Sequence, residues 1–154
     1  MAIKNINQLL RKFDKVGDVD LTQVIGKASM IVQKQAKELC PKDTGILASS
    51  ITTEVERQGK LFIGRIFTTL EYAPYVEFGT GIDGNGTYGY DIPGLTYRNT
   101  PWVYYNEHLG QFVFTYGHEA QPYMYPALKL SKDKVIEFVN KETQKLLLGI
   151  CRGG

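Results

Sequence analysis

The chain has 154 residues and a net charge of +2; 43% of its residues are hydrophobic and 22% are charged. This length fits one domain, residues 1–154, with a hydrophobic core. No apolar run approaches the ~20 residues needed to cross a bilayer, so we expect no membrane partner. Charges interrupt the apolar positions at the start, unlike a signal peptide, so we expect the protein to be made and kept in a cytoplasm. A net charge this small argues neither for nor against nucleic-acid binding.

Two helices are predicted at the start of the chain. Apolar residues recur at helical spacing over residues 6–16 and again, as a longer stripe, over residues 21–39. Asp18 or Asp20 can cap the second helix. Pro41 disfavours helical geometry at Cys40, so this helix should end near residue 39.

The segment "CPKDTGILASS", residues 40–50, raises the question of whether it is a nucleophile's pocket or a connection between a helix and a strand. Asp43 is a good N-cap for a following turn, and Gly45 allows a tight bend. We expect one helical turn over residues 44–49, with Ile46 and Leu47 facing the core. The serines that follow have no base near them in the sequence, which favours the connection.

The middle of the chain predicts strands joined by turns. Alternating residues indicate a strand over 51–57, and residues 61–69 return as a second, more buried strand. Pro74 excludes a central strand over 72–79, which we interpret as a short helical turn ending at Gly79. A long loop rich in Gly, Asn and Pro follows over residues 79–101.

The remainder predicts a hairpin over residues 102–117 that turns at 108–110, and a terminal helix over 121–150 with Pro126 near its first turn. Together these elements predict an α+β fold. An antiparallel sheet would pack against the long second and C-terminal helices, and a long glycine-rich loop would project from it.

The sequence contains incomplete matches to binding motifs for nucleotides and for calcium. The pattern G-x-G-x-x-G occurs at residues 79–84 and 84–89, but it runs into "YDIPG" rather than into a helix. Asp83 and Asn85 resemble the start of a calcium loop. Its twelfth position, which must be a bidentate Glu, is Gly94. We therefore expect no cofactor.

The residue spacings that zinc binding and nucleophilic catalysis require are also missing. The candidate zinc ligands share no recognised spacing; they are Cys40, His108, His118 and Cys151. Two cysteines are also too few for a disulfide framework. G-x-S-x-G is absent, and a thiol buried at the edge of a helical stripe is inert. Glu77 and Glu119 are isolated carboxylates. We expect no catalytic residue, no metal site and no enzymatic activity.

The aromatic residues are concentrated in one region. All ten tyrosines lie between residues 72 and 125, together with the single tryptophan. Two interpretations stay open: a protein–protein interface, or aromatic side chains used as strand formers. For the interface we name Tyr88, Tyr90, Tyr97, Trp102, Tyr104 and Tyr105. The loop would then be mobile in a free subunit and ordered on assembly. The alternative is a loop that folds back over its own sheet.

Three stretches, "CPKDTGILASSI", "YAPYVEFGTG" and "QPYMYPAL", resemble a bacteriophage family of small neck and tail-completion proteins. The family is typified by gene product ten of a lambdoid phage and is related to the minor tail protein Z of lambda. The likeness spans about residues 21–148. The principal motif positions are Pro41, Asp43, Thr44, Gly45, Leu47, Tyr72, Ala73, Glu77, Phe78, Gly79, Pro122 and Pro126. Two features depart from the family: Ala48 stands where a basic residue is common, and the loop and the hairpin are long.

The resemblance implies a structural virion protein that forms a ring at the head–tail junction, or neck. It would join head-closure or adaptor proteins to tail-terminator or tail-tube proteins, with a hexamer favoured and a dodecamer as the alternative. DNA would pass through the channel without sequence-specific binding. The protein would lie in the virion after assembly in the bacterial cytoplasm.

Two other functions stay open. The first is a tail-terminator ring. The second, of a different class, is a DNA-binding accessory domain that uses basic residues of the last helix, namely Lys129, Lys132, Lys134, Lys141, Lys145 and Arg152.

Overall fold

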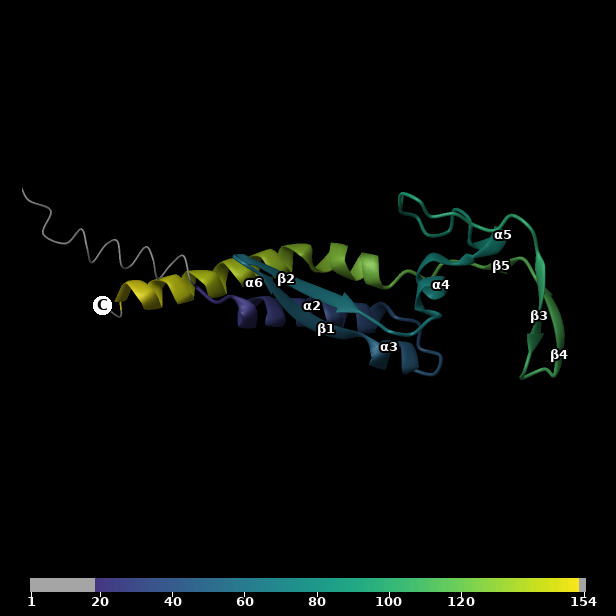
Figure 1. Cartoon of the computed structure of the whole chain (residues 1–154), viewed down its shortest axis with the longest axis horizontal. Coiled ribbons are helices and arrows are strands. Elements are labelled where there is room, and N and C mark those ends of the chain that lie inside the picture. The colour runs from purple at the N-terminus through teal and green to yellow at the C-terminus, as the bar shows by residue number, and fades with distance from the viewer. Residues whose placement is uncertain (1–18, 153–154) are drawn as a thin grey trace, which may run out of the picture. The chain divides into compact units, whose positions relative to one another are not determined.

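The computed structural model describes residues 19–152, and the helix predicted over residues 6–16 lies outside this range. The helices are α2 (Thr22–Leu39), α3 (Ile46–Ser50), α4 (Ala73–Phe78), α5 (Gly81–Gly84) and α6 (Met124–Arg152). The strands are β1 (Thr52–Gln58), β2 (Leu61–Phe67), β3 (Trp102–Asn106), β4 (Gln111–Thr115) and β5 (Gly117–His118) (Figure 1). The α+β class is confirmed. The antiparallel pairing is divided between two ribbons, β1–β2 and β3–β4.

The chain divides into two compact units. Among the described residues, the first unit contains residues 19–35, 52–67 and 129–152. The second unit contains residues 36–51 and 68–128. The expectation of a single domain over residues 1–154 stays a prediction. None of the helices among residues 19–152 combines the length and the apolar character that a bilayer crossing requires.

In the first unit, α2 forms where the apolar stripe predicted it. The Thr22 N–H donates to the Asp20 carboxylate at 2.9 Å, so Asp20 is the residue that caps the start. Hydrogen bonds from Thr22 lower the pKa of Asp20. Along the helix, Val24, Ala28 and Val32 are buried at a spacing of four residues, which is one face of an α-helix.

The β1–β2 ribbon also lies in the first unit, with Thr52 paired to Phe67 at one end and Gln58 to Leu61 at the other. Its backbone comes very close to α2 at Gly64, where an added Cβ would overlap the Oγ of Ser29. Ser29 is only 5% exposed, and its hydroxyl donates to the Ile25 carbonyl at 2.9 Å. A small residue on each side is therefore what allows this strand and helix to approach.

In the second unit, α3 confirms the expected helical turn but corrects its details. The N-cap is Gly45, with a φ of 75° that favours glycine. Thr44 Oγ1 accepts the Ile46 N–H at 3.4 Å, while Asp43 is exposed, so Asp43 as the cap was wrong. The physical reason is that the helix starts at Ile46, two residues later than expected, so that Gly45 takes the N-cap position. Leu47 is buried at 6% exposure as expected, whereas Ile46 is 54% exposed.

The α4 turn ends at Gly79 as predicted, but the loop expected over residues 79–101 starts with structure. Its first residues form α5, and isolated bridges pair Thr80 with His118 and Gly81 with Gly117. An added Cβ on Gly117 would overlap the Thr80 carbonyl, so this approach requires glycine. Residues 85–101 contain turns and bends without a helix or a strand.

The second unit also contains the predicted hairpin. Trp102 pairs with Thr115 and Asn106 with Gln111, and the Gly110 N–H donates to the Asn106 carbonyl at 2.8 Å to close the turn. The last helix, α6, begins at Met124 and has Pro126 in its first turn, where a missing N–H costs nothing. Both predictions are confirmed.

Candidate functional site

The centre of the second unit is the side chain of Glu77, which α4 carries in the short sequence "APYVEF". It is only 5% exposed, although a buried carboxylate is costly unless hydrogen bonds compensate the lost water. No ion pair with a Lys or Arg involves Glu77 within the part of the chain that the structure describes. Neutral donors therefore have to stabilise this charge.

Four donors converge on the Glu77 carboxylate. Oε2 accepts the N–H of Tyr123 at 2.7 Å and that of Met124 at 2.9 Å. Oε1 accepts the N–H of Tyr125 and the hydroxyl of Tyr88, both at 3.1 Å. The three N–H groups belong to the start of α6, where helical N–H groups have no partner within the helix. Glu77 thus caps the terminal helix from a distant part of the chain, where the helix dipole also favours a negative charge.

Burial beside this carboxylate changes the acidity of its neighbours. Burial, and then the nearby Glu77 charge, raises the pKa of the Tyr123 phenol to about 12. The same two causes raise the pKa of Tyr88. Burial followed by Glu77 also raises the pKa of the Cys40 thiol, whose side chain is 2% exposed. All three groups therefore stay neutral at ordinary pH, and Cys40 lacks the thiolate that a nucleophile needs.

Aromatic rings surround this network. Tyr88 contacts Phe78 edge-to-face at 4.9 Å between centroids and Tyr90 at 5.2 Å, and Tyr90 contacts Tyr125 at 4.4 Å. The Tyr97 hydroxyl donates to the Phe78 carbonyl at 2.9 Å. These contacts anchor the glycine-rich loop on its own unit, as in the alternative of a loop that folds back.

The interface expected from the sequence is corrected at one residue and stays a prediction at the others. Tyr88 is only 4% exposed, because its ring packs against α4 and its hydroxyl binds Glu77. It therefore has no face to offer a partner. Tyr104 and Tyr105 are 43% and 53% exposed. The ring of Trp102 lies over Gly81, at the base of the hairpin.

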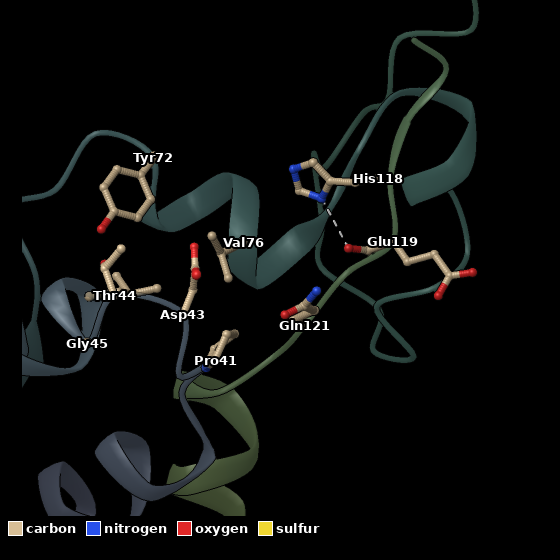
Figure 2. Close-up of a pocket in the computed structure, with 10 residues that line it drawn as sticks. Pro41, Asp43, Thr44, Gly45, Tyr72, Val76, His118, Glu119 and Gln121 are labelled. Carbon is tan, nitrogen blue, oxygen red and sulfur yellow. Dashed lines mark hydrogen bonds between the residues drawn. The ribbon is translucent and has the colours of Figure 1, made fainter. Parts of the chain in front are cut away.

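A pocket of about 520 Å³ lies beside the network, also within the second unit (Figure 2). Its lining is Pro41, Asp43, Thr44, Gly45, Leu47, Tyr72, Val76, His118, Glu119 and Gln121. Figure 2 shows Asp43 and Val76 between Tyr72 on one side and His118 on the other. The Gln121 N–H donates to the Val76 carbonyl at 2.9 Å, which ties the approach to α6 to α4.

The pocket lining offers carboxylates and an imidazole but no activated nucleophile. Ser49 and Ser50 donate to the carbonyls of Ile46 and Leu47, as helical serines commonly do, and neither lines the pocket. His118 Nδ1 lies 3.1 Å from the Glu119 carbonyl. Across residues 19–152, the side chains of His, Cys, Asp and Glu form no group of three that could hold a metal. The expectation that the protein is not an enzyme stays a prediction.

The structure brings the three motif stretches together. Six motif residues of the first two stretches line the pocket: Pro41, Asp43, Thr44, Gly45, Leu47 and Tyr72. Ala73 and Phe78 lie in α4 with Glu77, and Gly79 ends that helix. Pro122 precedes α6 and Pro126 lies in its first turn. Treating Glu77 as isolated missed its role. The available signal was an acid within a short apolar turn and a terminal helix with no capping side chain in its sequence.

A family model described as "Bacteriophage HK97-gp10, putative tail-component" matches residues 4–79. This span includes the first of the three motif stretches and the second as far as Gly79. No curated protein and no solved structure matches the chain.

Proposed function

We propose, because residues 4–79 match a family model of bacteriophage tail components, that this chain is a virion protein that forms a ring at the head–tail junction. The ring is a homo-oligomer, with a hexamer favoured over a dodecamer. It joins head-closure or adaptor proteins to tail-terminator or tail-tube proteins. DNA passes through its channel without sequence-specific binding, and assembly takes place in the cytoplasm of the bacterial host.

Besides the family match, this proposal rests on the contrast between a buried motif residue that holds the fold together and an exposed apolar ribbon. The motif residue Glu77 is used entirely in holding α4, the loop and α6 together. By contrast, the β3–β4 ribbon leaves large apolar side chains in water, including Phe112 at 74% exposure. Exposed apolar clusters of this kind mark surfaces that bind other proteins. A folded scaffold with an uncovered apolar ribbon fits an assembly subunit that catalyses no reaction.

The test is a phage deleted for this protein. We expect separate heads and tails in place of joined particles, and rejoining when purified protein is added. Reconstruction of the intact particle should place the ring on the tail axis at the neck. Joined, infective particles formed without the protein would contradict the proposal.

The same experiments separate the two alternatives. A tail-terminator ring would be found on isolated tails, and its loss would produce tails of uncontrolled length. A DNA-binding accessory domain would bind duplex DNA with an affinity that falls steeply with salt. Lys145 of α6 is already engaged, since it pairs with Glu142 at 2.5 Å.

A further inference from the structure

The pocket beside α4 combines apolar side chains with unpaired carboxylates. Leu47, which is 6% exposed, lies in its lining together with Pro41 and Val76. The lining also contains Asp43 and Glu119, which are both exposed, and it contains no Lys or Arg. Within residues 19–152, neither carboxylate forms an ion pair with a Lys or Arg. The pocket therefore suits a ligand that offers a cation beside an apolar group.

The size and the rim of the pocket narrow this ligand further. Its volume of about 520 Å³ lies within the about 300–1,000 Å³ of sites that hold small ligands, so it admits a few side chains of a peptide. Figure 2 shows the Asp43 carboxylate in the middle of the pocket and the Tyr72 ring on one side. Tyr72 is 42% exposed, and an aromatic face of this kind attracts a cation. The carboxylates would repel the phosphates of DNA, which leaves a basic peptide segment.

The chain itself contains a segment of this chemistry, residues 4–16, "KNINQLLRKFDKV". The segment has four cations and one acid, whereas the whole chain carries only +2, so the rest of the chain is slightly acidic. Its apolar residues recur at helical spacing, and the cations Arg11 and Lys12 directly adjoin Leu10 and Phe13. The segment lies outside the described residues. Its sequence supplies both groups that the pocket can bind.

The residues that follow this segment line a different pocket, and that pocket is basic. It has a volume of about 280 Å³, lies in the first unit, and is lined by Val19 and Leu21. Its lining also contains Arg57 and Lys60, whose charges repel a basic segment. The Arg57 guanidinium lies 5.2 Å from the centroid of the Phe62 ring. Charge therefore disfavours the pocket beside the segment's own attachment and favours the carboxylates of the pocket beside α4.

We propose that residues 4–16 of one copy bind the pocket beside α4 of the next copy. A cation at position 11 or 12 pairs with Asp43, and the Phe13 ring packs against Leu47. The proposal rests on the proposed ring and names the contact that holds it together. Because the donor segment and the acceptor pocket are different surfaces, the contact is heterologous, and heterologous contacts that repeat around an axis close into a ring.

The first experiment exchanges charges between the segment and the pocket in the full-length protein. Asp43→Lys should weaken association about tenfold, because repulsion replaces an exposed ion pair, as measured by sedimentation over a wide concentration range. Adding Arg11→Glu and Lys12→Glu should restore most of the association, which a folding defect would not allow. Asp91→Lys is the matched control, since Asp91 is an exposed acid of the same unit outside this pocket, and it should associate as the wild type does. Unchanged association of Asp43→Lys, or no restoration by the exchange, would overturn the inference.

The second experiment locates the segment without removing a contact. A photo-reactive phenylalanine analogue at position 13 keeps an aromatic ring there. On illumination of purified protein or of particles, we expect a covalent dimer of twice the 17.4 kDa chain mass, linked to residues 41–47 or 72–76 of the second copy. A cross-link within one chain, to another virion protein, or elsewhere on a second copy would overturn the inference.

The position of the protein in the particle separates this inference from the proposed function. Rings that assemble normally at the neck with Asp43→Lys would overturn the contact and leave the function standing. Copies linked through the pocket but located elsewhere in the tail would overturn the neck function and leave the contact standing. Wild-type protein that is monomeric in solution and in the particle would overturn both.

Discussion

Replacing Glu77 by Gln tests the central claim about how the second unit is held together. The substitution keeps the size of the side chain but removes its charge and turns one acceptor oxygen into an NH₂ donor. If the amide oxygen takes the place of Oε2, the NH₂ group faces the Tyr125 N–H, and two donors then oppose each other. The reverse orientation is worse, because it opposes the N–H groups of both Tyr123 and Met124.

The magnitude follows from these contacts. One buried N–H left without an acceptor costs about 1–3 kcal/mol, and hydrogen bonds to a neutral acceptor are weaker than those to a carboxylate. Loss of the charge at the start of α6 adds a few tenths to 1 kcal/mol. We therefore expect Glu77→Gln to lower the free energy of unfolding by about 3 kcal/mol. This is a large part of the 5–15 kcal/mol typical of a folded domain.

The assay is urea unfolding at neutral pH, monitored by circular dichroism and by tyrosine fluorescence. Glu119→Gln is the matched control, since Glu119 is exposed at the same pocket and should change stability by less than about 0.5 kcal/mol. Tyr88→Phe removes a single bond to Oε1 and should cost about 1 kcal/mol. A Glu77→Gln variant as stable as the control would refute the claim that this carboxylate caps α6.

Three further outcomes are expected. Gly64→Ala should destabilise the protein by about 1–3 kcal/mol because its Cβ overlaps Ser29, and adding Ser29→Ala should recover part of the loss; no recovery would contradict the overlap. Gly26→Ala should instead stabilise α2 by up to about 1 kcal/mol, because its Cβ would lie 3.6 Å from Val55; a loss of stability would show that this estimate of the space is wrong. Because folding raises the pKa of Tyr123 from 10 to about 12, its neutral phenol contributes fully to stability below pH 10, and this contribution is lost as the pH rises toward 12. Tyr123→Phe should therefore flatten the decline of stability at alkaline pH; an unchanged slope of stability against pH would count against this reasoning.

The sequence by itself determined the main elements and their order among the described residues, whereas it did not predict α5 and β5. Helix α2, both ribbons, the α4 turn and α6 form where periodicity, glycine and proline predicted them, because these signals act between neighbours in the chain. The resemblance to the phage family is confirmed by the family match over residues 4–79, which contains the first motif stretch and the second as far as Gly79. Proline after α2 and glycine after α4 end their helices for reasons that need no tertiary contact.

Only the tertiary structure decided what the motif residues do. Glu77 is an isolated acid along the chain, and its contribution to stability depends on N–H groups that lie 46 to 48 residues away in the sequence. The loop tyrosines divide in the same way: Tyr88 is buried beside Glu77, whereas Tyr105 is exposed on the ribbon, although both are tyrosines in an aromatic-rich region. Composition cannot separate them, because burial is set by which distant surface each side chain meets. A buried carboxylate is stable only where donors converge, and that convergence exists only in the folded chain.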